Sequence, residues 1–339
     1  MRNWQSLLLA VLVAALMVAP AWAQGYRSEY KVSTVVGSPF PWWQAAERWA
    51  ELVNERTEGR ITMRVYPGAQ LVAGDQTQEF NALRRGVIEM AVGSTINWSP
   101  QIRELNLFSL PFLMPDYAAI DALTQGAVGE QLFELLEQRG VVPLAWAENG
   151  FREVSNSQRA ISSPADMAGM KMRVVGSPLF NDTFTALGAN PTQMSWADAQ
   201  PALSTGAVDG QENPLSIYHG ARMYNIGQSH LTLWRYMADP LIFAVNRSVW
   251  DAFTEEDQEI VRQAALEAGA FGIEVARAGV TDEDQSLIEE IRSHGVTVTA
   301  LSDAQRQAFV DATREVYAKW AETIGTDLVQ MAEDAIANR

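Results

Sequence analysis

The sequence contains no cysteine and only three histidines among its 339 residues. Without cysteine there are no disulfides and no thiol nucleophile, so a large buried core has to stabilise the fold. The histidines, His219, His230 and His294, show no H-x-x-x-H or comparable metal-ligand spacing. G-x-S-x-G, Walker and G-x-G-x-x-G motifs are also absent. These absences argue against an enzyme and predict neither a cofactor nor a metal ion.

Positive charge is scarce, and lysine occurs only at Lys31, Lys171 and Lys319. The formal net charge is −16, which makes nucleic acid and anionic lipid headgroups poor partners. The basic residues are therefore mostly arginines, whose planar guanidinium matches a carboxylate at two points. An arginine that faces the interior of such an acidic protein would indicate an anionic ligand.

Long apolar runs are absent after the N-terminus, so no later segment is predicted to span a bilayer. At the N-terminus, Arg2 precedes an apolar run over residues 7–18, and Ala21-Trp22-Ala23 has the form of a signal-peptidase site. An uncleaved anchor is the alternative, but the run is short for a membrane span. We expect a signal peptide over residues 1–23 and an exported mature chain that carries 24 basic against 41 acidic residues.

Helical and strand patterns alternate along the mature chain, which predicts an α/β fold with a largely parallel sheet. A chain of this length with 47% hydrophobic residues is expected to form two lobes. We predict a first lobe over residues 24–150, a second over 151–245, and bracing and returning helices over 246–339. The predicted strands cover residues 30–36, 61–66, 89–93, 141–146, 171–175, 191–194 and 241–246. The predicted helices cover residues 43–57, 76–85, 117–139, 179–187 and 195–205.

A long helical pattern begins after Thr254, whose hydroxyl and the following acidic residues are a strong helix start. The pattern runs to about Ser293 without proline and would exceed ~50 Å as one helix. Such a helix could brace both lobes, unless Gly269, Gly272 or Gly279 bends or splits it. The chain after residue 302 is expected to be helical.

Polar side chains follow several predicted strands, where ligands bind in open α/β sheets. They suit a small ligand with one anionic group, because an arginine can hold a carboxylate while amides and hydroxyls bind its substituents. Structural roles without any ligand remain open for three of these residues. Arg173 could form an exposed ion pair, Trp196 could lie in the core, and Asn213 could cap a helix before Pro214. We expect the A-V-D-G-Q-E-N-P stretch, which contains Asn213, to form a constrained turn.

Three segments together resemble a known family. They are LFSLPFL (107–113), GMKMRVVGSPLF (169–180) and GANPTQMSWADAQPALSTGAVDGQENP (188–214). The likeness is to the solute-binding proteins of TRAP transporters, the DctP-like periplasmic receptors, and it extends over the mature chain. It implies two α/β lobes spanned by a long helix, closing on an organic acid in the periplasm of a Gram-negative bacterium.

The resemblance also implies roles for individual residues. Arg173 matches the family arginine that forms a two-point salt bridge with the ligand carboxylate, and Asn213 matches the amide that assists it. Arg152 resembles a second basic contact. Further ligand contacts are implied at Gln76, Ser94, Asn97 and Trp196. Sialic-acid members carry charged groups at the positions of Ser94 and Asn97, so that ligand is disfavoured here.

The function implied is that of a receptor, not an enzyme. It would bind a small organic acid and deliver it to TRAP permease subunits in the membrane. The family takes dicarboxylates as well as hydroxy, keto, sugar and aromatic acids, and the sequence does not choose among these. The alternatives are an exported carboxylate-dependent hydrolase or lyase and a ligand receptor for a sensor kinase.

Overall fold

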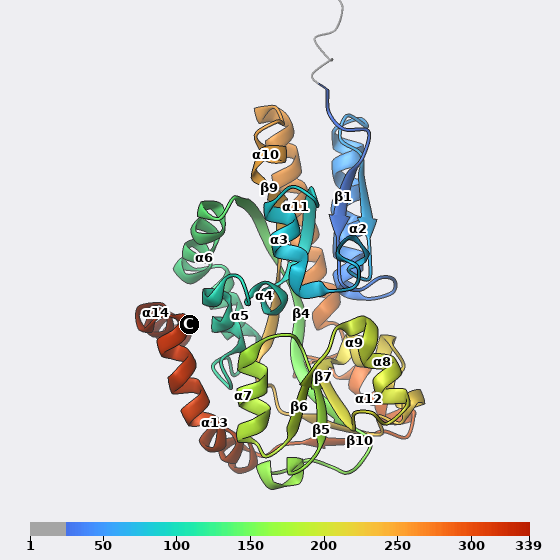
Figure 1. Cartoon of the computed structure of the whole chain (residues 1–339), viewed down its shortest axis with the longest axis vertical. Helices are drawn as coiled ribbons and strands as arrows, with labels where there is room; N and C mark the ends of the chain where they lie inside the picture. Colours follow the sequence, from blue (N-terminus) through green and yellow to red (C-terminus); the bar gives the residue numbers. More distant parts are fainter. Residues whose placement is uncertain (1–24) are drawn as a thin grey trace, which may run out of the picture.

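The computed structural model describes residues 25–339, which form two lobes stacked along the long axis of the molecule (Figure 1). Helices and strands alternate in both lobes, which confirms the predicted α/β class. The predicted signal peptide over residues 1–23 lies outside the described residues. Within residues 25–339, no helix has both the length and the apolar character needed to cross a membrane.

The first lobe opens with the predicted β-α-β-α-β unit, in which β1 pairs in parallel with both β2 and β3. Proline at the first position of α2 and an apolar stripe of alanine, leucine and tryptophan explain its start and its buried face. The elements are β1 (Tyr30–Ser33), α2 (Pro41–Arg56), β2 (Met63–Tyr66), α3 (Glu79–Arg84), β3 (Met90–Ser94) and α4 (Thr95–Trp98).

The second lobe is built around β5, which pairs in parallel with β6 and β7. Ser195 caps α8, the helix predicted over residues 195–205, by accepting a hydrogen bond from the backbone N–H of Asp198. The elements are β5 (Lys171–Val174), α7 (Pro178–Ala186), β6 (Asn190–Gln193), α8 (Trp196–Ser204), β7 (Gly210–Pro214) and α9 (Leu215–Gly220). Two further strands, β8 (His230–Leu233) and β10 (Thr297–Ala300), were not predicted.

Two long strands connect the lobes, β4 (Val141–Asn156) and β9 (Ala238–Asn246). β9 is antiparallel to β3 and β4, and β4 is antiparallel to β7, so the prediction of a largely parallel sheet is wrong at the centre. The reason is that β4 and β9 cross between the lobes in opposite directions. The strand expected over residues 141–146 continues to Asn156, and the predicted lobe boundary after Gly150 falls inside it.

The stretch expected to be a turn is a strand. β7 lies between β4 and β5, and all five of its residues are buried. Gly210 allows the close approach of β4, because a Cβ there would lie 2.4 Å from the carbonyl oxygen of Ser155. Pairing with β4, where Asn213 lies opposite Glu153, and not turn geometry, therefore holds Asn213 in place.

Two predicted helices are divided. The helix expected over residues 117–139 is interrupted at Gly126 and forms α5 (Tyr117–Thr124) and α6 (Ala127–Gln138). The pattern after Thr254 forms α11 (Glu255–Arg277) and α12 (Ser286–Ser293), separated near Gly279. Gly279 has φ +75°, and a Cβ there would lie 2.7 Å from the backbone of Leu287. The chain from Glu255 to Ser293 therefore reaches from the first lobe to the second as two helices, and not as one continuous helix of ~50 Å.

The remaining elements are short or lie near the C-terminus. They are α10 (Arg247–Trp250), α13 (Asp303–Ile324) and α14 (Thr326–Ala337), with 3₁₀ turns over Gln70–Val72, Gln76–Gln78, Arg103–Ser109, Pro164–Met167 and Met223–Ile226. Helix α13 joins both lobes, because Phe309 packs in a core of the second lobe while Trp320 and Ile324 pack in a core of the first.

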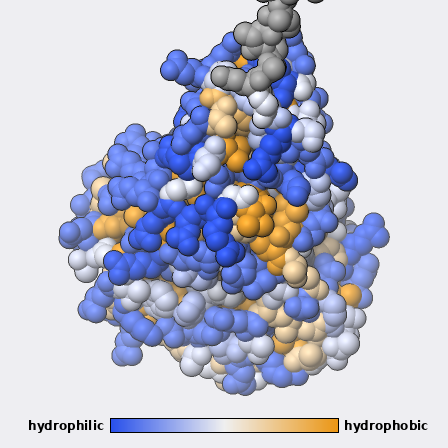
Figure 2. All heavy atoms as spheres, turned by 45° about the horizontal axis from the view of Figure 1, so that its top comes forward, coloured by the Kyte–Doolittle hydropathy of each residue, from blue (hydrophilic) through white to orange (hydrophobic). Residues whose placement is uncertain are grey.

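The apolar cores lie on both faces of the sheet. Along β9, Phe243 and Val245 face the core beneath α2 and α11, whereas Ile242 and Ala244 face the core beneath α5 and α6. This alternation follows from the two-residue period of a strand. On the face shown in Figure 2, hydrophilic side chains cover most of the surface, and hydrophobic atoms gather in a few separate areas.

Helix α11 packs closely on β4 at Gly269, and a substitution there can test this contact. A Cβ at this position would lie 2.4 Å from the carbonyl oxygen of Trp146, a backbone atom that cannot rotate away. We expect Gly269→Ala to lower the free energy of unfolding by on the order of 1–2 kcal/mol, measured by chemical denaturation. Helix propensity alone predicts a gain of about 1 kcal/mol, so a stabilised variant would contradict this packing.

Candidate functional site

A narrow cavity lies where the two lobes meet, and part of it is open to solvent. Residues from the first lobe, the second lobe and both connecting strands line it. The structure brings together all seven residues singled out from the sequence. They are Gln76, Ser94, Asn97, Arg152, Arg173, Trp196 and Asn213.

Arg173 lies on β5 and is 1% exposed, so it is not the exposed ion pair that its local sequence allowed. Its Nε and Nη2 donate to the carbonyl oxygen of Met194, at 3.1 and 2.9 Å. Among residues 25–339, no carboxylate lies within ion-pair distance of Arg173. Burial lowers the pKa of Arg173 to about 10, so the guanidinium stays protonated at neutral pH. The cavity thus contains a buried cation with no anionic partner in this part of the chain.

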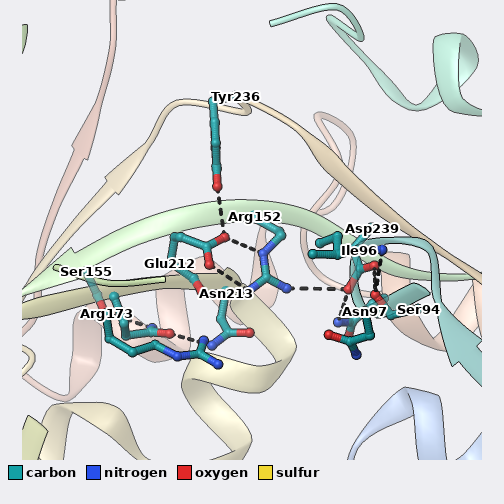
Figure 3. A network of polar contacts seen from close by, with 12 residues as sticks. Ser94, Ile96, Asn97, Arg152, Ser155, Arg173, Glu212, Asn213, Tyr236 and Asp239 are labelled. Atoms are coloured by element: carbon teal, nitrogen blue, oxygen red, sulfur yellow. Dashed lines mark hydrogen bonds and ion pairs between the residues drawn. The ribbon is translucent and has the colours of Figure 1, made fainter. Parts of the chain in front are cut away.

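Asn213 lies on β7, the strand next to β5 (Figure 3). Its Nδ2 donates to Oε1 of Gln211, whose Nε2 in turn donates to Oγ of Ser155 at 3.1 Å. This chain of hydrogen bonds fixes the orientation of the Asn213 amide. A side-chain amide has two N–H donors, so the second can serve a ligand.

Arg152 lies on β4 and is already paired. Its Nε and Nη2 both bind the carboxylate of Glu212, and its Nη1 lies 3.4 Å from Oδ2 of Asp239 (Figure 3). Tyr236 donates its hydroxyl to Glu212 at 3.0 Å. Burial alone would lower the pKa of Arg152, but the two carboxylates raise it above its usual value. Arg152 therefore differs from Arg173, because its charge is compensated inside the protein.

The first-lobe residues form two hydrogen-bonded groups, and one of them touches the second lobe. Gln76 donates to Oδ1 of Asn97 at 2.7 Å and accepts from the backbone N–H of Trp196 at 2.8 Å. Ser94 donates to Oδ1 of Asp239 at 2.5 Å. Trp196 is half-buried, and its ring centroid lies 5.9 Å from the guanidinium carbon of Arg173. Gln76 thus connects the lobes across the cavity.

Three polar residues of the site were missed as candidates. Asp239 and Asn149 line the cavity, and Asn149 donates to Asp239 at 2.8 Å. Burial raises the pKa of Asp239. Glu212 holds Arg152 from the residue next to Asn213. Asn149 follows a predicted strand and Glu212 belongs to the Q-E-N-P motif, so the sequence could have identified both as site residues. Nothing in the local sequence indicates a role for Asp239.

Residues 32–323 match the family model described as bacterial extracellular solute-binding protein, family 7 (DctP). The chain belongs to this family. Its similarity to relatives spans nearly the whole chain, and this confirms both the resemblance drawn from the sequence and the two-lobed fold.

Three related proteins illustrate what this chain is similar to. A TRAP periplasmic solute-binding protein from Ralstonia eutropha H16 is 62% identical, with a TM-score of 0.92 over 93% of this chain and 100% of that one. Its crystal structure holds (S)-2-hydroxy-2-methyl-3-oxobutanoate, or (S)-2-acetolactate. A Sulfurospirillum deleyianum protein with bound succinate is 29% identical, with a TM-score of 0.82 over 90% of this chain and 98% of that one. The 2,3-diketo-L-gulonate-binding periplasmic protein YiaO of Escherichia coli is 30% identical over 95% of each chain.

Next to the site, Glu153 on β4 is buried and accepts hydrogen bonds from the backbone N–H groups of Trp234 and Arg235, at 2.7 and 3.1 Å. Both bonds end on Oε2, so a glutamine could accept them through its single oxygen. Burial raises the pKa of Glu153 to about 7. The folded protein therefore binds this proton more tightly than the unfolded chain, whose glutamates have a pKa of about 4.3.

This difference predicts how Glu153→Gln depends on pH. Between about pH 4.5 and pH 7 the folded protein holds the extra proton, so the Glu153 contribution to stability is lost as pH rises. The variant has no such loss, and its free energy of unfolding should rise relative to the parent by about 3 kcal/mol over this window. Urea denaturation of both proteins at several pH values measures this difference. The same pH dependence of the free energy of unfolding in the parent and in Glu153→Gln would contradict the prediction.

Proposed function

We propose that this protein is an extracytoplasmic solute receptor of a TRAP transporter that binds a small organic acid through its carboxylate at Arg173. One observation carries the proposal: Arg173 is a fully buried guanidinium with which no carboxylate of residues 25–339 forms an ion pair. A buried charge without a partner is costly, and an anionic ligand would remove this cost. The second N–H of the Asn213 amide would assist at the same carboxylate.

The charges around the cavity favour a ligand with a single carboxylate. Arg173 can neutralise one carboxylate, whereas Arg152 is shared by Glu212 and Asp239. A second ligand carboxylate would face Asp239 without a cation of its own, and like charges in a buried site repel strongly. The cavity is therefore suited to a monocarboxylate whose other end is polar but uncharged.

The polar groups opposite Arg173 suit hydroxyl and keto substituents. Oδ1 of Asn149 is buried without a hydrogen-bond partner among the described residues and can accept from a ligand hydroxyl. Ser94 and Asp239 lie beside it. The ligand of the Ralstonia relative is a monocarboxylate with one hydroxyl and one keto group. We therefore assign to this cavity a short monocarboxylate with hydroxyl or keto substituents, such as a 2-hydroxy acid of the acetolactate type or a 2-oxo acid.

Closure of the two lobes would shield the ligand from water. The hydrogen bond between Gln76 and the backbone of Trp196 crosses the cavity and belongs to a closed arrangement. Gly150 offers a hinge in β4, because its φ is +117° and the pairing with β9 shifts register between Glu148 and Gly150. The closed form would dock on permease subunits in the membrane, with the protein in the periplasm after removal of residues 1–23.

A receptor releases its ligand unchanged, whereas a hydrolase or lyase would convert it. The relatives named above are binding proteins, and the carboxylates of Glu212 and Asp239 are already engaged by Arg152 and by neighbouring polar side chains. Mass spectrometry of the acid recovered after incubation and denaturation tests this point. Recovery of a product instead of the added acid would favour the enzyme.

Removing the unpaired cation tests the main proposal. We expect Arg173→Ala to weaken binding of (S)-2-acetolactate or a close analogue by at least about a hundredfold in calorimetry, because a desolvated charge pair is worth roughly 2–5 kcal/mol. The melting temperature without ligand should not fall, since the variant no longer buries an unpaired charge. Arg139→Ala, at an exposed arginine of the first lobe, is the matched control and should bind normally. Equal affinity of Arg173→Ala and the parent would refute the assignment.

The charge argument makes a separate prediction about selectivity. A thermal-shift screen should show larger shifts with short 2-hydroxy and 2-oxo monocarboxylates than with succinate or malate at equal concentration. At a hundredfold excess over Kd, the stabilisation of a bound acid is about 2.7 kcal/mol. Asp239→Asn should reduce the discrimination against dicarboxylates, because it removes the negative charge that a second carboxylate meets. Preferred binding of dicarboxylates by the parent would contradict the single-charge cavity while leaving Arg173 in its role.

A further inference from the structure

A second group of chemically active side chains lies outside the ligand cavity, in the second lobe. His219 in α9, Glu290 in α12 and His294 at the end of α12 each bring one ligand atom within 4.8 Å of the others. Two of the three histidines of the whole chain meet here, although 75 residues separate them (294 − 219). Sequence spacing gave no sign of this cluster, because its members come from two distant helices.

One pair of ligand atoms already has the spacing of a tetrahedral metal site. With metal–nitrogen and metal–oxygen bonds of ~2.0–2.1 Å, neighbouring ligand atoms lie roughly 3.3–3.4 Å apart. Nε2 of His219 is 3.5 Å from Oε1 of Glu290, which is close to this spacing. The centroids of the two imidazole rings are 6.0 Å apart, and two rings that share one metal ion are separated by roughly 5–6 Å. Glu290 and His294 are four residues apart and so lie on one side of α12.

The surroundings favour a cation and hold the rings in position. The ring of His294 stacks on Tyr224, with centroids 4.2 Å apart and an angle of 8° between the planes. Nε2 of His219 is the nitrogen near Glu290, and its Nδ1 is buried without a hydrogen-bond partner among residues 25–339, so Nδ1 does not compete for the ion. Both histidines lie at the C-terminal ends of their helices, where the backbone carbonyls carry partial negative charge.

We propose that His219, Glu290 and His294 form a site for Zn²⁺ or a similar divalent first-row transition-metal ion, with water as the fourth ligand. Two imidazoles and one carboxylate are typical ligands of this class, and an alkaline-earth ion would require more oxygen atoms. The ion would fasten α12 to α9. Since α9 directly follows β7 and carries Ile217, which lines the cavity, the ion would stabilise the part of the second lobe that faces the ligand.

Calorimetric titration with zinc chloride tests the site, using the mature chain without a polyhistidine tag. We expect one Zn²⁺ per chain and a higher melting temperature with zinc than without. His219→Ala and His294→Ala should each weaken zinc binding at least tenfold. Absence of zinc binding by the parent, or unchanged affinity in the His219→Ala/His294→Ala double variant, would overturn the proposal.

Two neighbouring glutamates provide a matched comparison. Glu290→Gln should weaken zinc binding, whereas Glu289→Gln should not, because Glu289 pairs with Arg292 and lies outside the cluster. Equal loss in both variants would indicate general attraction by an acidic surface and would refute a built site. Organic-acid binding is measured in the same variants. It should be retained in all of them, which separates a failure of the metal site from a failure of the receptor function.

Discussion

The architecture of the cavity depends on one unfavourable feature, a buried guanidinium, that of Arg173, with which no carboxylate of the described chain forms an ion pair. Two of the donors of Arg173 reach the carbonyl oxygen of Met194, and the ring of Trp196 lies close by. A carbonyl dipole and an aromatic ring relieve part of the cost of burying a cation, but less than a carboxylate would. The folded protein thus keeps a buried cation without an ion-pair partner between its lobes, and we propose that this cation selects an anionic ligand.

The neighbouring carboxylates do not pair with this cation because other partners already engage them. Glu212 lies next to Asn213 in β7, yet it binds both Arg152 and Tyr236. Asp239 is held by Arg152, Ser94 and Asn149. Three strands that are neighbours in the sheet, β4, β7 and β5, carry Arg152, Glu212 and Arg173. The fixed spacing of the strands therefore keeps one arginine paired and the other unpaired, which flexible loops could not ensure.

The sequence predicted most elements and the principal site residues, but for different reasons. Amphipathic patterns and caps located helices such as α2 and α11, because these signals are local. Arg173 and Asn213 came from motif resemblance, since the local sequence fits an exposed strand and a helix cap equally well. The opposed directions of β4 and β9, the strand character of β7 and the role of Asp239 were missed. Each of these depends on which strand becomes a neighbour, and such long-range pairing leaves no periodic trace in the sequence.

The connection between the lobes explains how ligand charge and lobe closure can be linked. Both β4 and β9 run from one lobe to the other without a break, and α13 packs on cores of both, so any relative movement has to be a bend and not a separation. The ladder between β4 and β9 is irregular at Gly150, only two residues before Arg152. A bend at this point would move the Arg152 network relative to Ser94 and Gln76 on the first lobe. Neutralising Arg173 lowers the cost of excluding water from the cavity, and excluding water is what closure requires. We therefore propose that ligand binding at Arg173 and a bend at Gly150 act on neighbouring residues of one cavity, which would couple ligand binding to lobe closure.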